Sequence, residues 1–176
     1  MGLLSPLLSS YVDTLNGLYA PIDESLFIRG TDLSGVGGSP AVDAALGDVA
    51  KRHPAMQFDA TAEENVAFTF RVPFGWTGFV VDVVWANSST GTGGVVWTVT
   101  YQRYGSGSTL GGETAGGGAT GTAGAKNVVV ITRPTASALP VVAGETVWIE
   151  LSRTVGNAGD TLANDAGVLG VLVGKA

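Results

Sequence analysis

The spacing of apolar residues changes once along the chain, from a helical period to an alternating one. After Ser5-Pro6, which suits a helix cap and first helical position, apolar side chains recur every three or four residues. They are Leu7, Leu8, Tyr11, Val12, Leu15, Leu18 and Tyr19, and this spacing predicts an amphipathic helix. Residues 29–38 have the composition of a loop. Ser39-Pro40 and a short stripe of Val42, Ala45, Leu46 and Val49 then predict a second helix. Residues 1–55 are therefore expected to form an N-terminal arm, helical in one or two short segments and otherwise extended.

From residue 56 onward apolar and polar positions alternate, as they do in a strand with one buried face. The segments expected to be strands are residues 66–72, 79–85, 95–101, 128–132, 147–151 and 168–173, with shorter ones at 56–58 and 139–142. Turn-rich stretches separate them and no helical pattern intervenes, which disfavours a parallel α/β sheet. The expected fold class is all-β, an antiparallel β-sandwich over residues 56–176 with a barrel as the open alternative.

The composition and net charge of the chain limit the classes of partner and site that can be expected. The 176 residues are 45% hydrophobic and 14% charged, with a net charge of -6 and no cysteine. No basic patch is present to neutralise phosphates, so nucleic acid is not an expected partner. No apolar run approaches 18 residues, so no membrane span is expected. Disulfides and thiolate metal sites are excluded.

The stretch GGGATG, residues 116–121, matches the dinucleotide-binding spacing G-x-G-x-x-G. That site requires a strand before the glycines and a helix after them, because the helix N-terminus holds the pyrophosphate. Here the glycines lie in a glycine-rich stretch and the following residues enter a predicted strand. We therefore expect no nucleotide site, and we expect residues 105–125 to be a long loop.

Other residues with catalytic or ligand chemistry have simple structural interpretations beside the functional ones. His53, the single histidine, is expected to end the second helix, although a catalytic triad would need it as base. Glu63 and Glu64 read as a solvated turn, with paired carboxylates as the alternative. Asp160, Asn164 and Asp165 could bind a hard cation such as calcium, but these residue types are also common in turns. No metal site is expected.

The tryptophans divide into core and surface candidates. Trp85 and Trp97 lie on the apolar faces of their strands and are expected in the core. Trp148 alternates with Val147 and Ile149, so it should point out of the sandwich, towards an interface or a second buried surface. Apolar residues on the second faces of two strands, Val80, Val84 and Val96, also indicate a surface that an oligomer would bury.

Three stretches resemble the small β-sandwich structural proteins of tailed-bacteriophage virions. They are MQFDATAEENVAFTFRVPFGW, GGVVWTVTYQRYG and ETVWIELSRTVGNAGDTLANDAGVLGVLV. The last has a strand of the form xVxIxLxR, with Arg153 in the final position, followed by a D-T-L-x-x-D-A turn that begins at Asp160. The resemblance covers roughly residues 56–174 and does not include the arm.

This resemblance implies a jelly-roll sandwich without catalytic residues or cofactors. It implies a decoration or cement protein on the capsid surface, which would bind the major capsid protein, form a homotrimer and bridge capsid subunits. The residues expected to form the interfaces are Leu7, Leu8, Tyr11, Leu15 and Leu18 in the arm and Trp148 in the sandwich. The alternative is a tail fibre or baseplate component that recognises a host surface glycan, with Trp76 and Tyr104 lining the groove. A carboxylate-based hydrolase is a third, disfavoured class.

Overall fold

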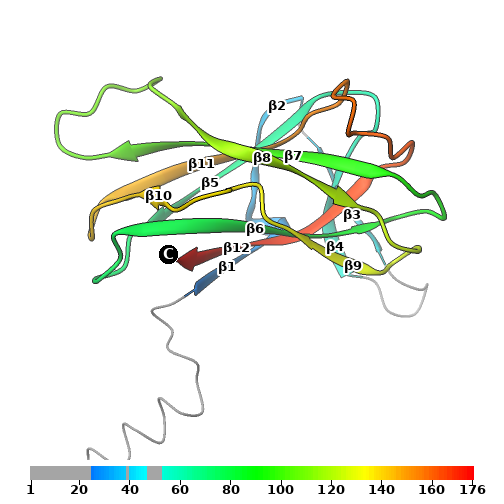
Figure 1. The fold of residues 1–176 in the computed structure, drawn as a ribbon, viewed down its shortest axis with the longest axis horizontal. Coiled ribbons are helices and arrows are strands. Elements are labelled where there is room, and N and C mark those ends of the chain that lie inside the picture. The colour runs from blue at the N-terminus through cyan, green and yellow to red at the C-terminus, as the bar shows by residue number, and fades with distance from the viewer. Residues whose placement is uncertain (1–24, 39, 47–52) are drawn as a thin grey trace, which may run out of the picture.

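The structure, a computed structural model, describes residues 25–38, 40–46 and 53–176. Two antiparallel sheets face each other and form a β-sandwich (Figure 1). The fold class expected from the alternating pattern is therefore confirmed. The helix predicted over residues 7–19 lies outside the described residues.

The first sheet is built around two long strands, β6 (Gly78–Asn87) and β12 (Ala166–Lys175), which pair with each other. Within the described residues its main order is β10-β6-β12-β4-β3, with β9 also on β6 and β1 also on β12. The remaining strands of this sheet are β1 (Ser25–Arg29), β3 (Ala41–Leu46), β4 (His53–Phe58), β9 (Val129–Thr132) and β10 (Leu139–Pro140).

The second sheet has the order β2-β5-β11-β7-β8. Its strands are β2 (Ser34–Gly37), β5 (Glu64–Arg71), β7 (Gly94–Tyr104), β8 (Thr114–Thr122) and β11 (Thr146–Arg153). A single 3-10 turn, η1 (Gly30–Asp32), carries the chain from β1 in the first sheet to β2 in the second.

The core lies between the sheets and is rich in aromatic rings. Trp85 of β6 and Trp97 of β7 are both fully buried, and their ring centroids are 5.8 Å apart. Phe58 meets Trp97 edge-on at 5.1 Å, an arrangement favoured by the ring quadrupoles. The indole N–H of Trp85 donates a hydrogen bond to Thr132 Oγ1 at 2.9 Å, which satisfies its buried polar atom. The core positions predicted for Trp85 and Trp97 are confirmed.

All eight strand segments expected from alternation are present, as β4, β5, β6, β7, β9, β10, β11 and β12. The predicted boundary between an arm of residues 1–55 and a sandwich of residues 56–176 differs from the observed one, because the sheets begin earlier in the chain. β1, β2 and β3 lie inside the predicted arm and belong to the sheets. Residues 41–46, predicted as part of a second helix, form a strand because their backbone pairs with β4. Pairing with an existing edge overrides a weak helical spacing.

The glycine-rich stretch also differs from expectation. Residues 114–122, predicted as loop, form β8, which pairs with β7 from Gly94↔Thr122 to Tyr101↔Thr114. Glycine has low strand propensity, so the pairing comes from the long β7 edge that β8 covers. The described residues contain no α-helix, and thus none that could cross a membrane.

Candidate binding surfaces

In the motif that carries the phage resemblance, Arg153 and Asp160 form a buried ion pair. We call this pair, together with the hydrogen bonds of Arg153, the lock. Arg153, fully buried at the end of β11, pairs with Asp160 through Nη2 to Oδ1 at 2.8 Å and Nε to Oδ2 at 3.1 Å. Its other N–H groups donate to the carbonyl oxygens of Phe58, Leu162 and Asn164 at 2.7 to 3.2 Å. The lock therefore ties the turn before β12 to β4 and β11. A buried guanidinium needs this complete set of partners, since an unpaired one would be costly.

The lock also accounts for the residues considered for a cation. Asp160 is committed to Arg153, and it also accepts a hydrogen bond from the Val96 N–H at 3.1 Å. Asn164 contributes its backbone carbonyl to Arg153. Over residues 25–38, 40–46 and 53–176, no group of three or more histidine or carboxylate side chains could hold a metal ion.

Glu64 takes part in a hydrogen-bonded turn with Asp59, whereas Glu63 and His53 are exposed. Asp59 Oδ1 accepts hydrogen bonds from the Thr61 hydroxyl, at 2.7 Å, and from the Thr61 N–H, and these two bonds lower the pKa of Asp59. Glu64 Oε2 accepts the Asp59 N–H at 2.6 Å, while burial raises the pKa of Glu64. Glu63 is exposed, as the turn interpretation expects. His53 is exposed at the start of β4, so its predicted place at a helix end is wrong.

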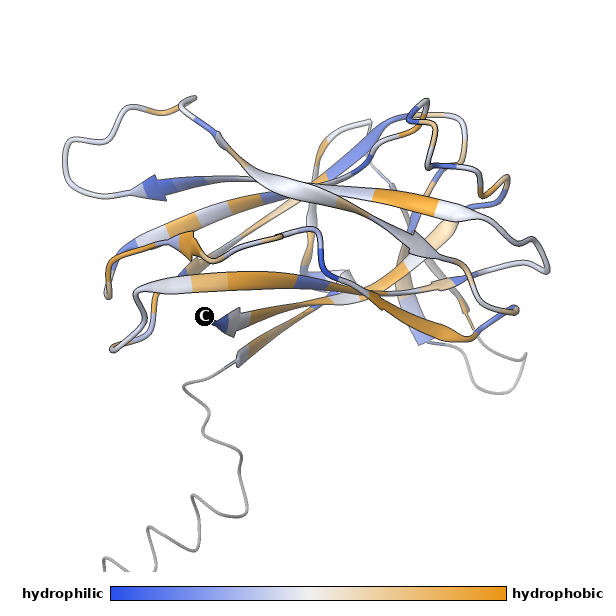
Figure 2. Ribbon diagram, in the orientation of Figure 1, coloured by the Kyte–Doolittle hydropathy of each residue, from blue (hydrophilic) through white to orange (hydrophobic). Residues whose placement is uncertain are grey.

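The outer face of the first sheet is more apolar than that of the second sheet, although it also carries the ion pair of Asp82 and Arg133 beside Leu172. On the first sheet, cross-strand register places Phe27 beside Leu172, and Val84 beside Ile131. We define the apolar face as the outward residues Phe27, Val80, Val84, Val129, Ile131 and Leu172. Three of them are more than half exposed: Phe27 at 53%, Val129 at 53% and Ile131 at 62%. Figure 2 shows the hydrophobic colour running along β6, β12 and β9 of this sheet.

On the second sheet the outward residues are mostly polar. We define the polar face as Thr69, Thr98, Thr100, Gln102, Trp148 and Glu150. Trp148 lies on the central strand β11, between Thr69 of β5 and Gln102 of β7. Gln102 is fixed there, because its side-chain amide donates to Thr109 O at 2.5 Å and its Oε1 accepts from the Gly111 N–H at 3.3 Å. Trp148 is partly exposed, so its predicted outward direction is confirmed.

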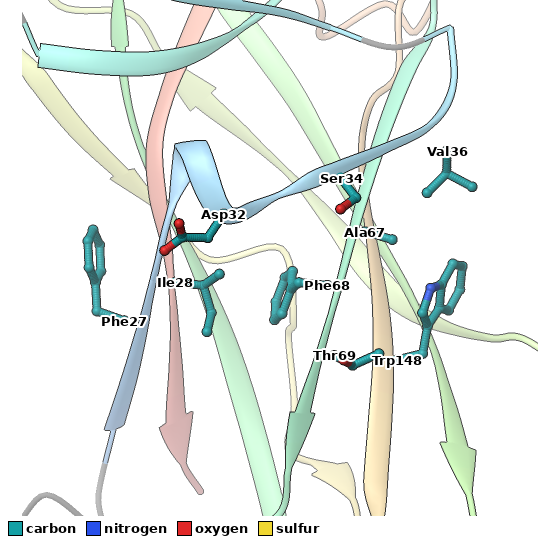
Figure 3. A pocket seen from close by; sticks show the side chains of 9 residues that line it. All are labelled: Phe27, Ile28, Asp32, Ser34, Val36, Ala67, Phe68, Thr69 and Trp148. Carbon is teal, nitrogen blue, oxygen red and sulfur yellow. The ribbon is translucent and has the colours of Figure 1, made fainter.

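A groove runs from this polar face to the edge of the sandwich (Figure 3). Its volume is about 480 Å³, and its lining comes from β1, η1, β2, β5 and β11. Trp148 and Val36 lie at one end, Phe27 at the other, with Ser34, Asp32 and Thr69 between them. The Asp32 carboxylate is held by Arg29, whose Nε donates to Oδ2 at 2.9 Å. Sequence reasoning missed this groove because two of its walls, β1 and β2, fell inside the predicted arm.

Glu150 gives the polar face an acidic side. Partial burial raises the pKa of Glu150, and the negative charges of Glu113 and Glu63 raise it further. Its neighbours across the sheet are Ala67 and Thr100.

The prediction that Trp76 and Tyr104 line a glycan-binding groove is wrong for Trp76. Trp76 is only 1% exposed and packs against Phe70 in the core, with ring centroids 6.3 Å apart. It therefore cannot present a face to a sugar. Tyr104 is partly exposed at the end of β7. The arm residues Leu7, Leu8, Tyr11, Leu15 and Leu18 lie outside the described residues.

No protein-family model and no curated protein matches the chain. Solved structures share its fold. The CBM36-1 domain of a multidomain xylanase from the hindgut metagenome of Trinervitermes trinervoides is 14% identical, with a TM-score of 0.50, over 86% of this chain and 98% of that domain. Arthrobacter globiformis T6 isomalto-dextranase, complexed with panose, is 13% identical, with a TM-score of 0.55, over 86% of this chain and 23% of the enzyme.

At these identities the likeness establishes an antiparallel sandwich of jelly-roll type and nothing about activity. Neither structure is a phage virion protein, and the relation to that class remains an expectation from the sequence.

Proposed function

We propose that the chain is a decoration protein of a tailed-phage head, a non-catalytic virion component that binds the major capsid protein and bridges capsid subunits. The observation that carries the proposal is the apolar face. Phe27, Val129 and Ile131 are each more than half exposed on one sheet. Exposed apolar surface of this kind marks a protein–protein interface.

The closing hairpin supports the same proposal. Arg153 and Asp160, the residues that carry the phage resemblance, hold the fold together through a buried ion pair. A motif with this role is expected in a structural protein. In our proposal three copies associate through the apolar face. Trp148, expected from the sequence as an interface residue, lies on the opposite sheet and is not part of this contact.

Residues 1–24 supply the second attachment element. They lead into Ser25 at the start of β1, an edge strand of the sheet that carries the apolar face. At about 25 cal/mol per Å² of buried apolar surface, an arm covering several hundred Å² contributes several kcal/mol before the cost of association. Leu7, Leu8, Tyr11, Leu15 and Leu18 are the proposed anchors.

Immunogold electron microscopy of intact particles, with an antibody against the whole chain, tests the location. Gold over the head is expected. Gold confined to the tail would contradict the decoration proposal and favour the tail-component alternative.

The arm is tested by a double substitution, Leu8→Asp with Leu15→Asp. It places charge in the apolar stripe and should abolish attachment to undecorated heads in a co-sedimentation assay. The control is Ser9→Asp with Asn16→Asp, which adds the same charge outside the apolar stripe, about 100° around the predicted helix from Leu8 and Leu15, and should attach normally. Attachment of the Leu8/Leu15 variant at the wild-type level would refute the role of the arm.

A further inference from the structure

We propose that the polar face, with the adjoining groove, binds a neutral oligosaccharide, and that the Trp148 indole is its stacking platform. The inference goes beyond attachment to a shell and uses none of the residues before Ser25.

The exposure of Trp148 sets it apart from the other tryptophans. Trp76, Trp85 and Trp97 are at most 1% exposed, whereas Trp148 is partly open to solvent on the central strand of its sheet. An indole at such a position presents a flat apolar surface. The C–H face of a pyranose ring stacks on a surface of this kind, in the way apolar ligand groups pack on the aromatic residues of binding sites.

The residues around Trp148 suit the hydroxyl groups of a sugar. Thr69 lies directly across on β5, and Thr100 lies two residues away along β7 from Gln102. The hydroxyl groups of Thr69 and Thr100 can donate and accept hydrogen bonds, and the Glu150 carboxylate can accept hydrogen bonds from sugar hydroxyls. A sugar needs an apolar surface for stacking and hydrogen-bond donors and acceptors beside it, and the surroundings of Trp148 offer both. A protein partner with an apolar patch would not need the polar groups.

The groove extends this platform. Its volume of about 480 Å³ lies within the range of small-molecule sites, about 300 to 1,000 Å³. Beyond Trp148 and Thr69 it offers the Ser34 hydroxyl and the Asp32 carboxylate (Figure 3). Arg29 pairs with Asp32 at this end of the groove, and both side chains are open to solvent. An elongated groove with polar groups along it fits a chain of sugar units better than a single ring.

The acidic residues around the polar face favour a neutral ligand over an acidic one. Glu63 and Glu113 lie near enough to Glu150 to affect its pKa, and Asp32 lies in the groove. Arg29 is engaged by Asp32. Because Arg29 balances the charge of Asp32, the negative potential of this face comes from Glu63, Glu113 and Glu150, and it disfavours uronic acids and sialylated glycans.

The opposite face makes a protein ligand the poorer choice here. Val129 and Ile131 of the apolar face are more than half exposed and do not line the groove, so this part of the first sheet offers a protein an apolar surface that the polar face lacks. Phe27 lies where the apolar face meets the groove. The two faces are therefore assigned to different chemical classes of partner.

The experiment is affinity electrophoresis of the full chain in native gels containing dextran, galactomannan, xyloglucan or mannan, with alginate as the acidic comparison. At least one neutral polysaccharide should retard the wild type, and alginate should not. Trp148→Ala should weaken that retardation at least about tenfold, as expected for loss of an aromatic anchor. Trp148→Phe, which keeps a smaller ring, should fall between Trp148→Ala and the wild type.

Ile131→Ser on the apolar face is the matched control and should bind like the wild type. Circular dichroism of each variant checks that the sandwich is folded, and the graded order of the Trp148 variants separates lost stacking from general damage. Absence of retardation by all four neutral polysaccharides, or undiminished binding by Trp148→Ala, would overturn the inference. Attachment to heads is measured on particles, so failure there leaves this result unaffected.

Discussion

At the scale of single residues, Arg153 and Asp160 form the most deeply buried ion pair among the described residues. Both side chains are nearly inaccessible, at 0% and 3%, and Arg153 is fully surrounded by acceptors. The pair of Arg133 and Asp82 has similarly short contacts, but Arg133 is 56% exposed. Breaking the pair of Arg133 and Asp82 should therefore cost less free energy of unfolding than breaking the buried pair, because the exposed Arg133 remains hydrated.

Asp160→Ala should therefore lower the free energy of unfolding by about 3 to 5 kcal/mol, since it leaves the Arg153 guanidinium buried without its counter-charge. Arg133→Ala is the control and should cost about 1 kcal/mol or less. Urea denaturation followed by tryptophan fluorescence measures both. Equal losses for the two variants would show that the lock is not the main ionic contribution.

Glu150 gives a prediction about pH. Burial and the nearby Glu113 and Glu63 raise its pKa in the folded chain, so the folded state holds the Glu150 proton more tightly than the unfolded state does. Its contribution to stability is therefore fully present at pH values below the unfolded pKa and is lost as pH rises through the folded one. Glu150→Gln should be more stable than the wild type at pH 7, and the two should converge near pH 3. Thermal unfolding across this range measures the difference, and a gap of constant size would contradict the assignment.

At the scale of elements, β8 shows what the glycines of residues 116–121 do. Gly121 is buried beneath Thr132, and a Cβ at that position would lie 2.0 Å from Thr132 Oγ1 and 3.0 Å from the Trp85 ring. Gly116 is close to Val99 in the same way, at 3.0 Å. These glycines let β8 approach β9 and the core. The G-x-G-x-x-G spacing is therefore explained by close packing of a strand.

Gly121→Ala should destabilise the sandwich by about 1 to 3 kcal/mol, the usual cost of overpacking. Gly112→Ala is the control, because a Cβ there would meet only the Gln102 amide at 3.8 Å. Thermal unfolding of both variants decides the matter. A Gly121→Ala protein with the wild-type midpoint would mean that β8 can move away from Thr132 at no cost.

Which elements the sequence could predict depends on where each strand gets its stability. β5, β6, β7 and β11 alternate clearly because each has one face in the core, and alternation is visible without the fold. β2 reads Ser-Gly-Val-Gly and is exposed throughout, so it exists only because Ser34 and Gly35 pair with β5. The direction of Trp148 followed from alternation, but the groove beside it required β1 and β2. Pairing partners distant in sequence leave no local pattern.

At the scale of the whole molecule, the sandwich begins earlier than its sequence indicated. β1 pairs with β12 over five residues, from Ser25↔Gly174 to Arg29↔Gly170. Its half-buried Leu26 and Ile28 pack against the main core. The strand therefore closes one edge of the larger sheet and is part of the folding unit.

Two truncations test this boundary. Removal of residues 1–24 deletes no pairing that the described residues make, so the melting temperature should stay close to that of the full chain. Removal of residues 1–32 also deletes β1 and η1 and uncovers apolar core, and it should cost about 2 kcal/mol or more. Differential scanning calorimetry compares them. A large loss in the shorter truncation would show that residues 1–24 stabilise the sandwich itself.

The antiparallel pairing of Ser25 with Gly174 also has a geometric consequence for any particle that displays this chain. Ser25, where the described residues begin, and Ala176 lie at the same end of the sandwich, whereas the turn at residues 88–93 lies at the other end of β6. If residues 1–24 attach the protein to a shell as proposed, cargo fused after Ala176 would lie close to the attachment surface. A peptide inserted at Thr90 would instead project from the distal tip, which makes that turn the natural site for presenting an epitope.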